Sequence, residues 1–456
     1  MYRKYTLSLF TALCAWCASA QHVACGDHFT IASCADSTLV AWGNNNTGEL
    51  GNGTTTDSND PGPVALLTQV TKFAVGDGHV LALKADGTAW AWGYNYNGEY
   101  GNGTSQITSL VPILSAPLSG IVGLAGGGGH SLFLLNDGTV WASGLNETGQ
   151  LGTTTGITSE VAVQVDSLTD VVACAANEYA SYALKADGTV WSWGKNDNGQ
   201  LGNGTNANSA LAQPINGLSS ITAISAFGYH ALALKVDGTV WAWGDNAAGQ
   251  LGIGTNVDSN VPVQVPGLSD MSVIAAGRGH SVAIKADGTL WAWGSNQSGQ
   301  LGMGNNTLSL VAMQVPGASD LIAVDAGNYH TVMVKADGTV WATGDNSAGQ
   351  LGNGTNTGSN VPVQIVSMCG IALDAPEADD PSSPVIYPNP STGPVTIEGC
   401  ANGSAVLVRD AWGREVLRTT VRGTRSDLDL SRCMPGIYSV TQAIAGGSVT
   451  RRIVLQ

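Results

Sequence analysis

The sequence predicts an all-β protein in which a seven-bladed β-propeller is followed by a small C-terminal β-sandwich. The chain of 456 residues contains 61 Gly, and only 11% of its residues are charged, which favours tight turns over charged helices. A unit of about 50 residues recurs seven times. Each unit holds four short strand patterns, and four antiparallel strands per repeat are typical of a propeller.

The first 20 residues have the features of a signal peptide. Arg3 supplies positive charge before a mostly apolar run from Tyr5 to Trp16, and cleavage is predicted between Ala20 and Gln21. The apolar run is too short for a stable membrane span. No later stretch is long and apolar enough to span a membrane, so we expect no transmembrane segment in the mature chain and a monomeric protein.

The seven units can be aligned on the Gly that ends the third strand pattern. Residues 21–370 are therefore predicted to form the propeller. An Asp-Gly pair between the second and third patterns favours a tight hairpin turn, and a Val-Pro pair in the fourth pattern suits an edge strand. The aligned glycines are Gly43, Gly93, Gly144, Gly194, Gly244, Gly294 and Gly344.

Tryptophans fall in two columns of the repeat that lie two residues apart, so both columns face the same side of a sheet. We expect them to pack blade against blade, which we favour over a ligand-stacking or light-absorbing cluster. The first column contains Trp90, Trp141, Trp191, Trp241, Trp291 and Trp341. The second contains Trp42, Trp92, Trp193, Trp243 and Trp293.

The segments ALKADGTVWAWG, GQLGNGT and Gly-x-x-His resemble the repeats of the regulator-of-chromosome-condensation family over about residues 22 to 368. The resemblance implies a propeller but leaves the activity open, because this fold hosts unrelated functions. Relatives include a nuclear nucleotide-exchange factor, a plant ultraviolet photoreceptor and a secreted bacterial inhibitor of β-lactamases. The Trp and Arg pairing of the photoreceptor loops is missing here, and an exported protein reaches neither chromatin nor a nuclear GTPase.

After the repeats, residues 371–384 read as an acidic, Pro/Ser-rich linker. Residues 385–456 resemble the type A C-terminal sorting domain of type IX secretion. The resemblance implies recognition by the type IX secretion machinery, with export through the periplasm to the outer cell surface or beyond. The residues that carry it are Tyr387, Pro388, Asn389, Pro390, Asp410, Gly413, Arg414, Gly436, Tyr438 and Arg452.

The charge and the cysteine content limit the classes of ligand and site that we expect. Residues 21–370 hold 25 acidic and eight basic residues, which argues against nucleic-acid binding. Export permits disulfides, and sequence proximity predicts the pairs Cys25–Cys34 and Cys400–Cys433. The mature chain has no Cys-x-x-Cys pair, so we expect no metal site, and no motif indicates a cofactor.

Histidine recurs at one position of the repeat, and such recurrence favours a structural role over a catalytic one. We expect a repeated hydrogen bond near a turn of each blade. No phosphate loop, nucleophile elbow or metalloprotease motif accompanies these residues. We therefore predict no catalytic residue and no enzyme. The column contains His79, His130, His230, His280 and His330.

The two residues before this column vary from repeat to repeat. Equivalent loops of a propeller gather on one face, and loops on a rigid scaffold carry recognition. Tyr and Arg are common anchors of protein interfaces. The predicted partner-binding residues are Tyr179, Phe227, Tyr229, Arg278 and Tyr329.

The sequence thus favours a secreted or cell-surface scaffold without enzymatic activity that recognises a protein, or a glycan, through one propeller face. One alternative is an extracellular propeller enzyme, either a hydrolase or a lyase. Another is a structural or adhesion component of the cell surface. Detection of a bound protein partner distinguishes a recognition scaffold from a structural or adhesion component.

Overall fold

The computed structural model describes residues 22–365 and, further on, residues 385–387, 394–398, 403–409, 415–421, 423, 425–430, 436–444 and 447–455. Contacts divide the chain into two compact units, Met1–Ala372 and Leu373–Gln456. Several predicted features lie outside the described residues. They are the cleavage site at Ala20 and Gln21, the cysteines Cys400 and Cys433, and the sorting residues Pro388, Asn389, Pro390, Asp410, Gly413 and Arg414.

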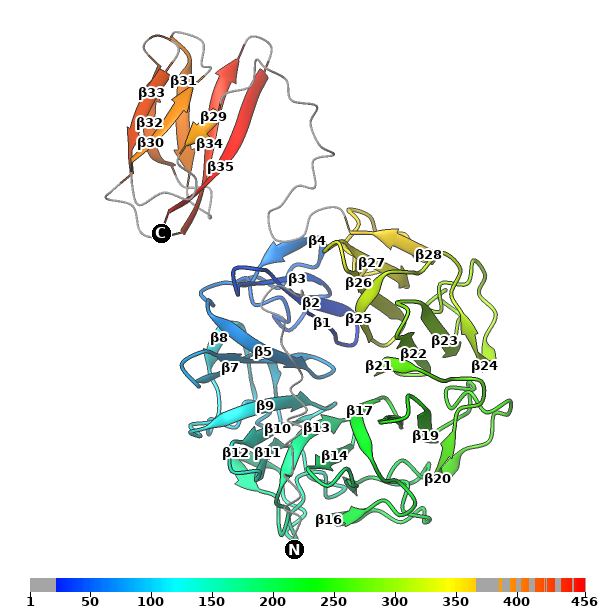
Figure 1. Ribbon diagram of the computed structural model, residues 1–456. Helices are drawn as coiled ribbons and strands as arrows, with labels where there is room; N and C mark the ends of the chain where they lie inside the picture. Colours follow the sequence, from blue (N-terminus) through cyan, green and yellow to red (C-terminus); the bar gives the residue numbers. More distant parts are fainter. Residues whose placement is uncertain are drawn as a thin grey trace, which may run out of the picture. The chain divides into compact units, whose positions relative to one another are not determined.

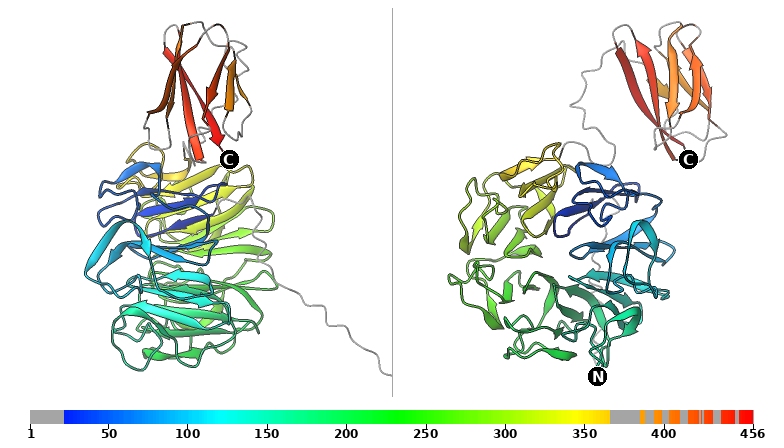
Figure 2. Two further views of the ribbon diagram at one scale, coloured as in Figure 1. Left: turned by 90° about the vertical axis from the view of Figure 1, so that its left-hand side faces the viewer. Right: turned by 180° about the vertical axis from the view of Figure 1, so that it is seen from behind.

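The first unit is a ring of seven four-stranded antiparallel sheets, which confirms the predicted propeller (Figures 1 and 2). The innermost strands are β1 (Val23–Cys25), β5 (Val70–Val75), β9 (Ile121–Gly126), β13 (Val171–Ala176), β17 (Ile221–Phe227), β21 (Met271–Ala276) and β25 (Leu321–Ala326). The second strands are β2 (Phe29–Ser33), β6 (His79–Lys84), β10 (His130–Leu135), β14 (Ala180–Lys185), β18 (His230–Lys235), β22 (His280–Lys285) and β26 (His330–Lys335).

The third strands are β3 (Leu39–Gly43), β7 (Ala89–Asn95), β11 (Val140–Gly144), β15 (Val190–Gly194), β19 (Val240–Gly244), β23 (Leu290–Gly294) and β27 (Val340–Gly344). The outer strands are β4 (Ser58–Pro63), β8 (Ile107–Leu114), β12 (Ser159–Gln164), β16 (Ser209–Pro214), β20 (Ser259–Gln264), β24 (Ser309–Gln314) and β28 (Ser359–Gln364). Each blade is built from four consecutive strands, and β1 lies beside β25 to close the ring.

The core of the propeller is seven apolar clusters, one between each pair of neighbouring blades. Trp191 and Trp193 contribute to the same cluster, which confirms that the two tryptophan columns share a face. The second column is buried, and each of its indole Nε1 atoms donates to a backbone carbonyl of the preceding blade at 2.8 to 2.9 Å. These side chains therefore join the blades, as expected.

Because adjacent strands run antiparallel, the connections of a blade emerge at two ends. We call the end with the first-to-second and third-to-fourth strand connections the loop face. The opposite end, the turn face, carries the second-to-third strand turns, such as the one at Asp86-Gly87, and the links between blades. In the long loops of the loop face, a buried Asn holds the backbone: Asn196 Oδ1 accepts from Leu201 N at 2.9 Å, and its Nδ2 donates to Thr205 O at 2.9 Å.

The same long loops protect the outer edge of the neighbouring blade. Gly204 N donates to Asn260 O at 2.8 Å, and Gly53 N donates to Leu110 O at 2.8 Å. Exposed strand edges invite pairing with other chains, and these bonds occupy part of each edge. The loop face is therefore anchored at its rim as well as at its centre.

The second unit contains two sheets whose described core residues face each other, which confirms the predicted β-sandwich. In the described residues, no helix is long and apolar enough to cross a membrane. One sheet has the order β29 (Val385–Tyr387), β30 (Pro394–Glu398) and β33 (Arg425–Asp429). The other has the order β32 (Glu415–Thr420), β31 (Ala405–Arg409), β34 (Gly436–Ile444) and β35 (Gly447–Leu455).

The predicted Cys25–Cys34 disulfide is wrong. Cys25 is a buried free thiol, whereas Cys34 is disulfide-bonded to another cysteine. The register explains why: Cys25 lies opposite Thr30, and Cys34 follows the far end of the same hairpin, so the two side chains stand at opposite ends of it. Cys174 is also a free thiol, so the partner of Cys34 lies outside the described residues.

Candidate binding face

The histidine column links each blade to the next. Every histidine in it is fully buried, and its Nε2 lies within hydrogen-bond distance of a hydroxyl on the second strand of the following blade. The pairs are His79–Ser131 at 2.9 Å, His130–Ser181 at 2.9 Å, His230–Ser281 at 2.8 Å, His280–Thr331 at 2.9 Å and His330–Thr30 at 3.1 Å. This confirms the structural interpretation of the column.

In four of the five pairs, the hydroxyl partner fixes the tautomer of the ring because it donates its own hydrogen to a backbone carbonyl. Ser181 Oγ donates its hydrogen to Gln150 O at 2.8 Å, so it accepts from His130 Nε2–H. Burial lowers the pKa of His79 to about 4 and that of the other four histidines to about 3, which keeps all five rings neutral. Neutral rings already engaged between blades leave the loop face without a base from this column.

Each of the two blades that lack the histidine is followed by a blade that lacks the hydroxyl. Ala180 replaces the histidine in the fourth blade, and the hydroxyl position of the fifth blade holds Ala231. Phe29 replaces it in the first blade, and the second blade holds Val80. Donor and acceptor are thus present or absent together at all seven junctions, because either one alone would be a buried, unsatisfied group.

The loops between first and second strands form a ring at the centre of the loop face. The backbone N–H of one loop donates to a carbonyl in the loop of the next blade, with N–O distances of 3.2 to 3.4 Å. Six of the seven junctions are joined in this way. The donors are the backbone N–H groups of Asp27, Asp77, Gly128, Glu178, Arg278 and Asn328.

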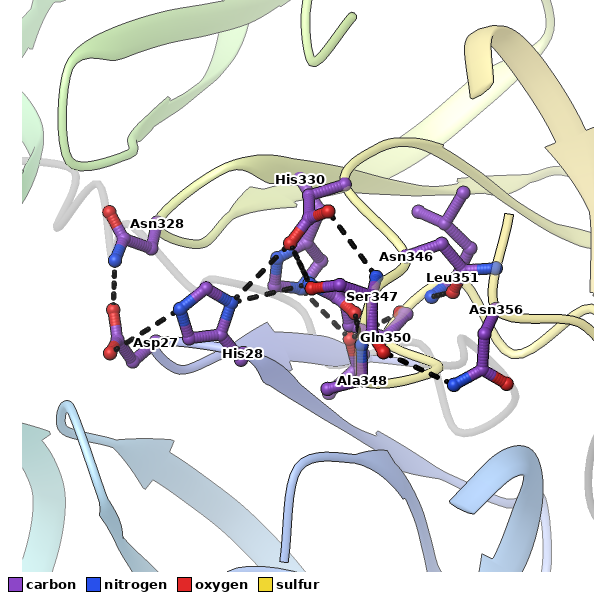
Figure 3. A network of polar contacts seen from close by, with 12 residues as sticks. Asp27, His28, Asn328, His330, Asn346, Ser347, Ala348, Gln350, Leu351 and Asn356 are labelled. Atoms are coloured by element: carbon purple, nitrogen blue, oxygen red, sulfur yellow. Dashed lines mark hydrogen bonds and ion pairs between the residues drawn. The ribbon is translucent and has the colours of Figure 1, made fainter. Parts of the chain in front are cut away.

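A polar network closes this ring where the last blade meets the first (Figure 3). Asn328 Nδ2 donates to Asp27 Oδ1, and His28 lies 3.8 Å from Asp27 and 3.7 Å from Asp345. Gln350 Nε2 donates to Asp345 Oδ2 at 2.7 Å. The network joins residues about 300 positions apart and ties the last blade to the first on the loop face.

Three carboxylates and one guanidinium converge on the ring. Desolvation, together with the charges of Glu178 and Asp27, raises the pKa of Asp77 to about 7, and the charge of Arg278 offsets part of this increase. Burial lowers the pKa of Arg278, but Glu178 and Asp27 raise it overall. Asp27, Asp77, Glu178 and Arg278 thus influence one another electrostatically on the loop face, and we call these four residues the acidic cluster.

The structure brings two predicted residues together beside this cluster. The rings of Tyr179 and Tyr229 lie 6.3 Å apart, and Lys195 Nζ lies 5.1 Å from the first and 5.6 Å from the second. Burial and a hydrogen bond donated to Glu178 raise the pKa of the Tyr229 hydroxyl. An aromatic pair that holds a cation is thus joined to the acidic cluster.

The other predicted residues lie elsewhere around the ring. Tyr329 is 38% exposed and its ring lies 5.9 Å from that of His28. Arg278 lies within electrostatic reach of Tyr329 as well as of the acids. Phe227 packs against the apolar cluster between the fifth and sixth blades and contributes mainly to the core.

Sequence reasoning did not single out Asp27, Asp77, Glu178 or Tyr94 as site residues. Asp77 and Glu178 hold the variable position two residues before the histidine column, so their place in the repeat was visible. Their convergence on one site could not be seen in the sequence, because it depends on the ring, which brings separate blades together. Tyr94 lies just past Gly93 in the second blade and stacks on Tyr96 with centroids 4.9 Å apart.

No cluster of three or more metal-ligating side chains occurs among the residues that the structure describes. Asp27, Asp77 and Glu178 instead line one recess together with Tyr94 and Tyr179. Such a surface can attract and orient a cationic group by charge and by aromatic contact.

Family models match most of the chain. A model described as RCC1-like domain matches residues 8–318, and models of the regulator of chromosome condensation (RCC1) repeat match residues 321–350 and 337–370. A model described as secretion system C-terminal sorting domain matches residues 385–456.

Solved structures resemble the propeller. Human WBSCR16 is 23% identical, with 73% of this chain and 95% of that chain covered at a TM-score of 0.66. Prp20p from Saccharomyces cerevisiae, studied for its binding to Gsp1p and histones, is 23% identical, with 74% and 86% covered at a TM-score of 0.65. At these identities the similarity establishes the fold alone.

Proposed function

The chain belongs to the RCC1-like propeller family and carries a type IX secretion sorting domain, and from this premise we propose that it is an exported, non-enzymatic scaffold that binds a protein partner through its loop face. The sorting domain directs the protein to the cell surface or the extracellular space. The propeller is then the part available for recognition.

One observation carries the proposal: side chains that differ from blade to blade stand on a backbone ring that is the same in nearly every blade. The hydrogen-bonded loops fix positions, while the residues at those positions change from acid to glycine, tyrosine, arginine and asparagine. A rigid frame with varied side chains lowers the entropy cost of binding and gives specificity.

The family offers support of the same kind. The yeast relative Prp20p is described as binding Gsp1p and histones, and yeast RCC1 has been solved bound to Kap60. These are protein partners, which favours a protein over a glycan for this chain.

The proposal is tested by capturing partners with the exported protein from secreted and surface material. The variant Tyr229→Ala/Tyr329→Ala removes two aromatic side chains from the loop face, and Val172→Ala/Val236→Ala removes exposed apolar side chains from the turn face as a control. We expect a discrete protein partner that binds wild type and control and is lost from the tyrosine variant. Retention of that partner by the tyrosine variant, or hydrolysis of a substrate with no partner captured, contradicts the proposal.

A further inference from the structure

A cavity of about 310 Å³ opens on the loop face among the first four blades. Its lining includes three carboxylates, those of Asp27, Asp77 and Glu178, and two aromatic side chains, Tyr94 and Tyr179. Among the described residues, no lysine or arginine lines it; Arg278 influences the carboxylates from outside the lining, and Lys195 Nζ lies 5.1 Å from the Tyr179 ring. The cavity therefore combines net negative charge with aromatic surface.

Glycines hollow this cavity. Where other blades place Tyr179, Tyr229 or Tyr329, the second and third blades have Gly78 and Gly129, and Gly128 stands at the position of Glu178. None of these three glycines has a left-handed backbone, so the turn itself does not require glycine there.

Side chains at these positions would close the space. A Cβ on Gly78 would lie 3.3 Å from the Cβ of Tyr94, and one on Gly129 would lie 3.1 Å from Asn97 Nδ2. A Cβ on Gly128 would lie 3.1 Å from Asp77 Oδ2 and only 2.7 Å from Glu178 O, so the close approach of the next loop also requires glycine there. The glycines thus open a path from the surface down to the carboxylates.

The Asp77 carboxylate at this site has no hydrogen bond or ion pair with any residue in the described part of the chain, and it is largely, though not fully, shielded from water. A desolvated carboxylate without a partner is costly, and two further carboxylates nearby increase the cost. A cation that enters the cavity would relieve it. The guanidinium group suits such a site best, because it pairs with carboxylates in a planar fork and stacks on aromatic rings.

We propose that this cavity receives an arginine side chain presented by the protein partner. The inference rests on the proposed function, since it names the chemical group through which the loop face recognises that partner. The carboxylates of the lining give the charge, the tyrosines give the aromatic contact, and the missing side chains at the three glycines give the room.

The probe is a short peptide with one central arginine between neutral residues, titrated calorimetrically into the full exported protein at low salt. Matched peptides carry citrulline, which keeps the shape and removes the charge, or lysine. The variant Asp77→Asn/Glu178→Gln removes two charges from the cavity. The control Asp270→Asn/Asp320→Asn removes two exposed charges beside the turn face, at positive-φ positions that asparagine tolerates.

We expect the arginine peptide to bind wild type and control alike, and to bind the Asp77→Asn/Glu178→Gln variant more than about tenfold more weakly. The citrulline peptide should lose a similar factor on wild type, and lysine should fall between the two. Gly78→Tyr should block the arginine peptide by filling the cavity. Wild-type protein that ignores the arginine peptide, or a control variant that loses as much binding as the cavity variant, overturns the proposal.

The same variants separate this inference from the proposed function. A captured partner that needs Tyr229 and Tyr329 but binds the Asp77→Asn/Glu178→Gln variant unchanged would leave the loop face as the binding surface and refute the arginine cavity. Loss of the partner from both variants, together with discrimination against citrulline, supports both.

Discussion

Asp77 is a residue of the candidate site that lowers the stability of the folded propeller. Its carboxylate is largely desolvated and is destabilised by the charges of Glu178 and Asp27, with Arg278 in partial compensation. Groups with strongly shifted pKa values concentrate at functional sites, since selection for stability alone would remove them. The residue is thus the clearest mark, at the scale of single side chains, that the loop face has a task beyond folding.

We predict that Asp77→Asn stabilises the protein at alkaline pH. The pKa of the folded state, about 7, lies above the ordinary value of 3.8, so stability from the protonated carboxyl is complete below pH 4 and lost as the pH rises through 7. At pH 8 the variant should gain up to about 4 kcal/mol in free energy of unfolding, and at pH 4 almost nothing. Urea unfolding at the two pH values measures this; an equal effect at both would contradict the assignment.

At the scale of residues, the sequence predicted only that one set of side chains lies on a single ring of loops. These are Tyr179, Tyr229, Arg278 and Tyr329. Their role in binding stays a prediction. The acids were missed because a carboxylate at a variable loop position looks like ordinary solvating charge. Only the closure of the ring brings residues from the first, second and fourth blades to one cavity.

At the scale of elements, the blades are joined by pairs that match across each junction. A histidine on one second strand meets a hydroxyl on the next, or both are replaced by apolar side chains. The strands themselves follow from local alternation and Asp-Gly turns, which explains why their number and order were predictable. The pairing of histidine with hydroxyl was not predictable, because the repeat spacing does not show which residues of neighbouring blades contact each other.

We predict that His130 and Ser181 are energetically coupled. Ser181→Ala leaves His130 Nε2–H buried without an acceptor and should cost about 1–3 kcal/mol. His130→Ala should cost as much or more, since it also leaves a cavity. The double variant should cost less than the sum by about 1 kcal/mol or more.

Urea unfolding of the four proteins measures this cycle. Ala231→Ser, at a junction where Ala180 offers no partner, serves as the control for adding a hydroxyl and should give no stabilisation. Strict additivity of His130→Ala and Ser181→Ala would show that the hydrogen bond does not couple the two blades.

At the scale of the whole molecule, stability depends on closing a circle of seven similar units. The sequence predicted the number of blades, yet it placed the disulfide within the first hairpin because proximity along the chain was its only guide. In the closed ring, Cys34 belongs to the same apolar cluster as Ile365 of the last blade, and Cys369 follows four residues later.

We therefore predict a disulfide between Cys34 and Cys369 that fastens the first blade to the last. Because the bond closes a very long loop, removing it with Cys369→Ser should cost about 2–5 kcal/mol in free energy of unfolding. Peptide mapping without reduction identifies the pair directly. A peptide that links Cys34 to Cys400 or Cys433 would refute this pairing.

The central claim, that the exported propeller recognises a protein through its loop face, is tested most directly by photo-crosslinking on cells. A photoreactive phenylalanine analogue would replace Tyr229 or Tyr329 on the loop face, and Asp187 or Asp287 on the turn face. The account predicts one discrete protein adduct shared by positions 229 and 329 and missing from 187 and 287. Adducts confined to 187 and 287 would place recognition on the turn face and contradict it.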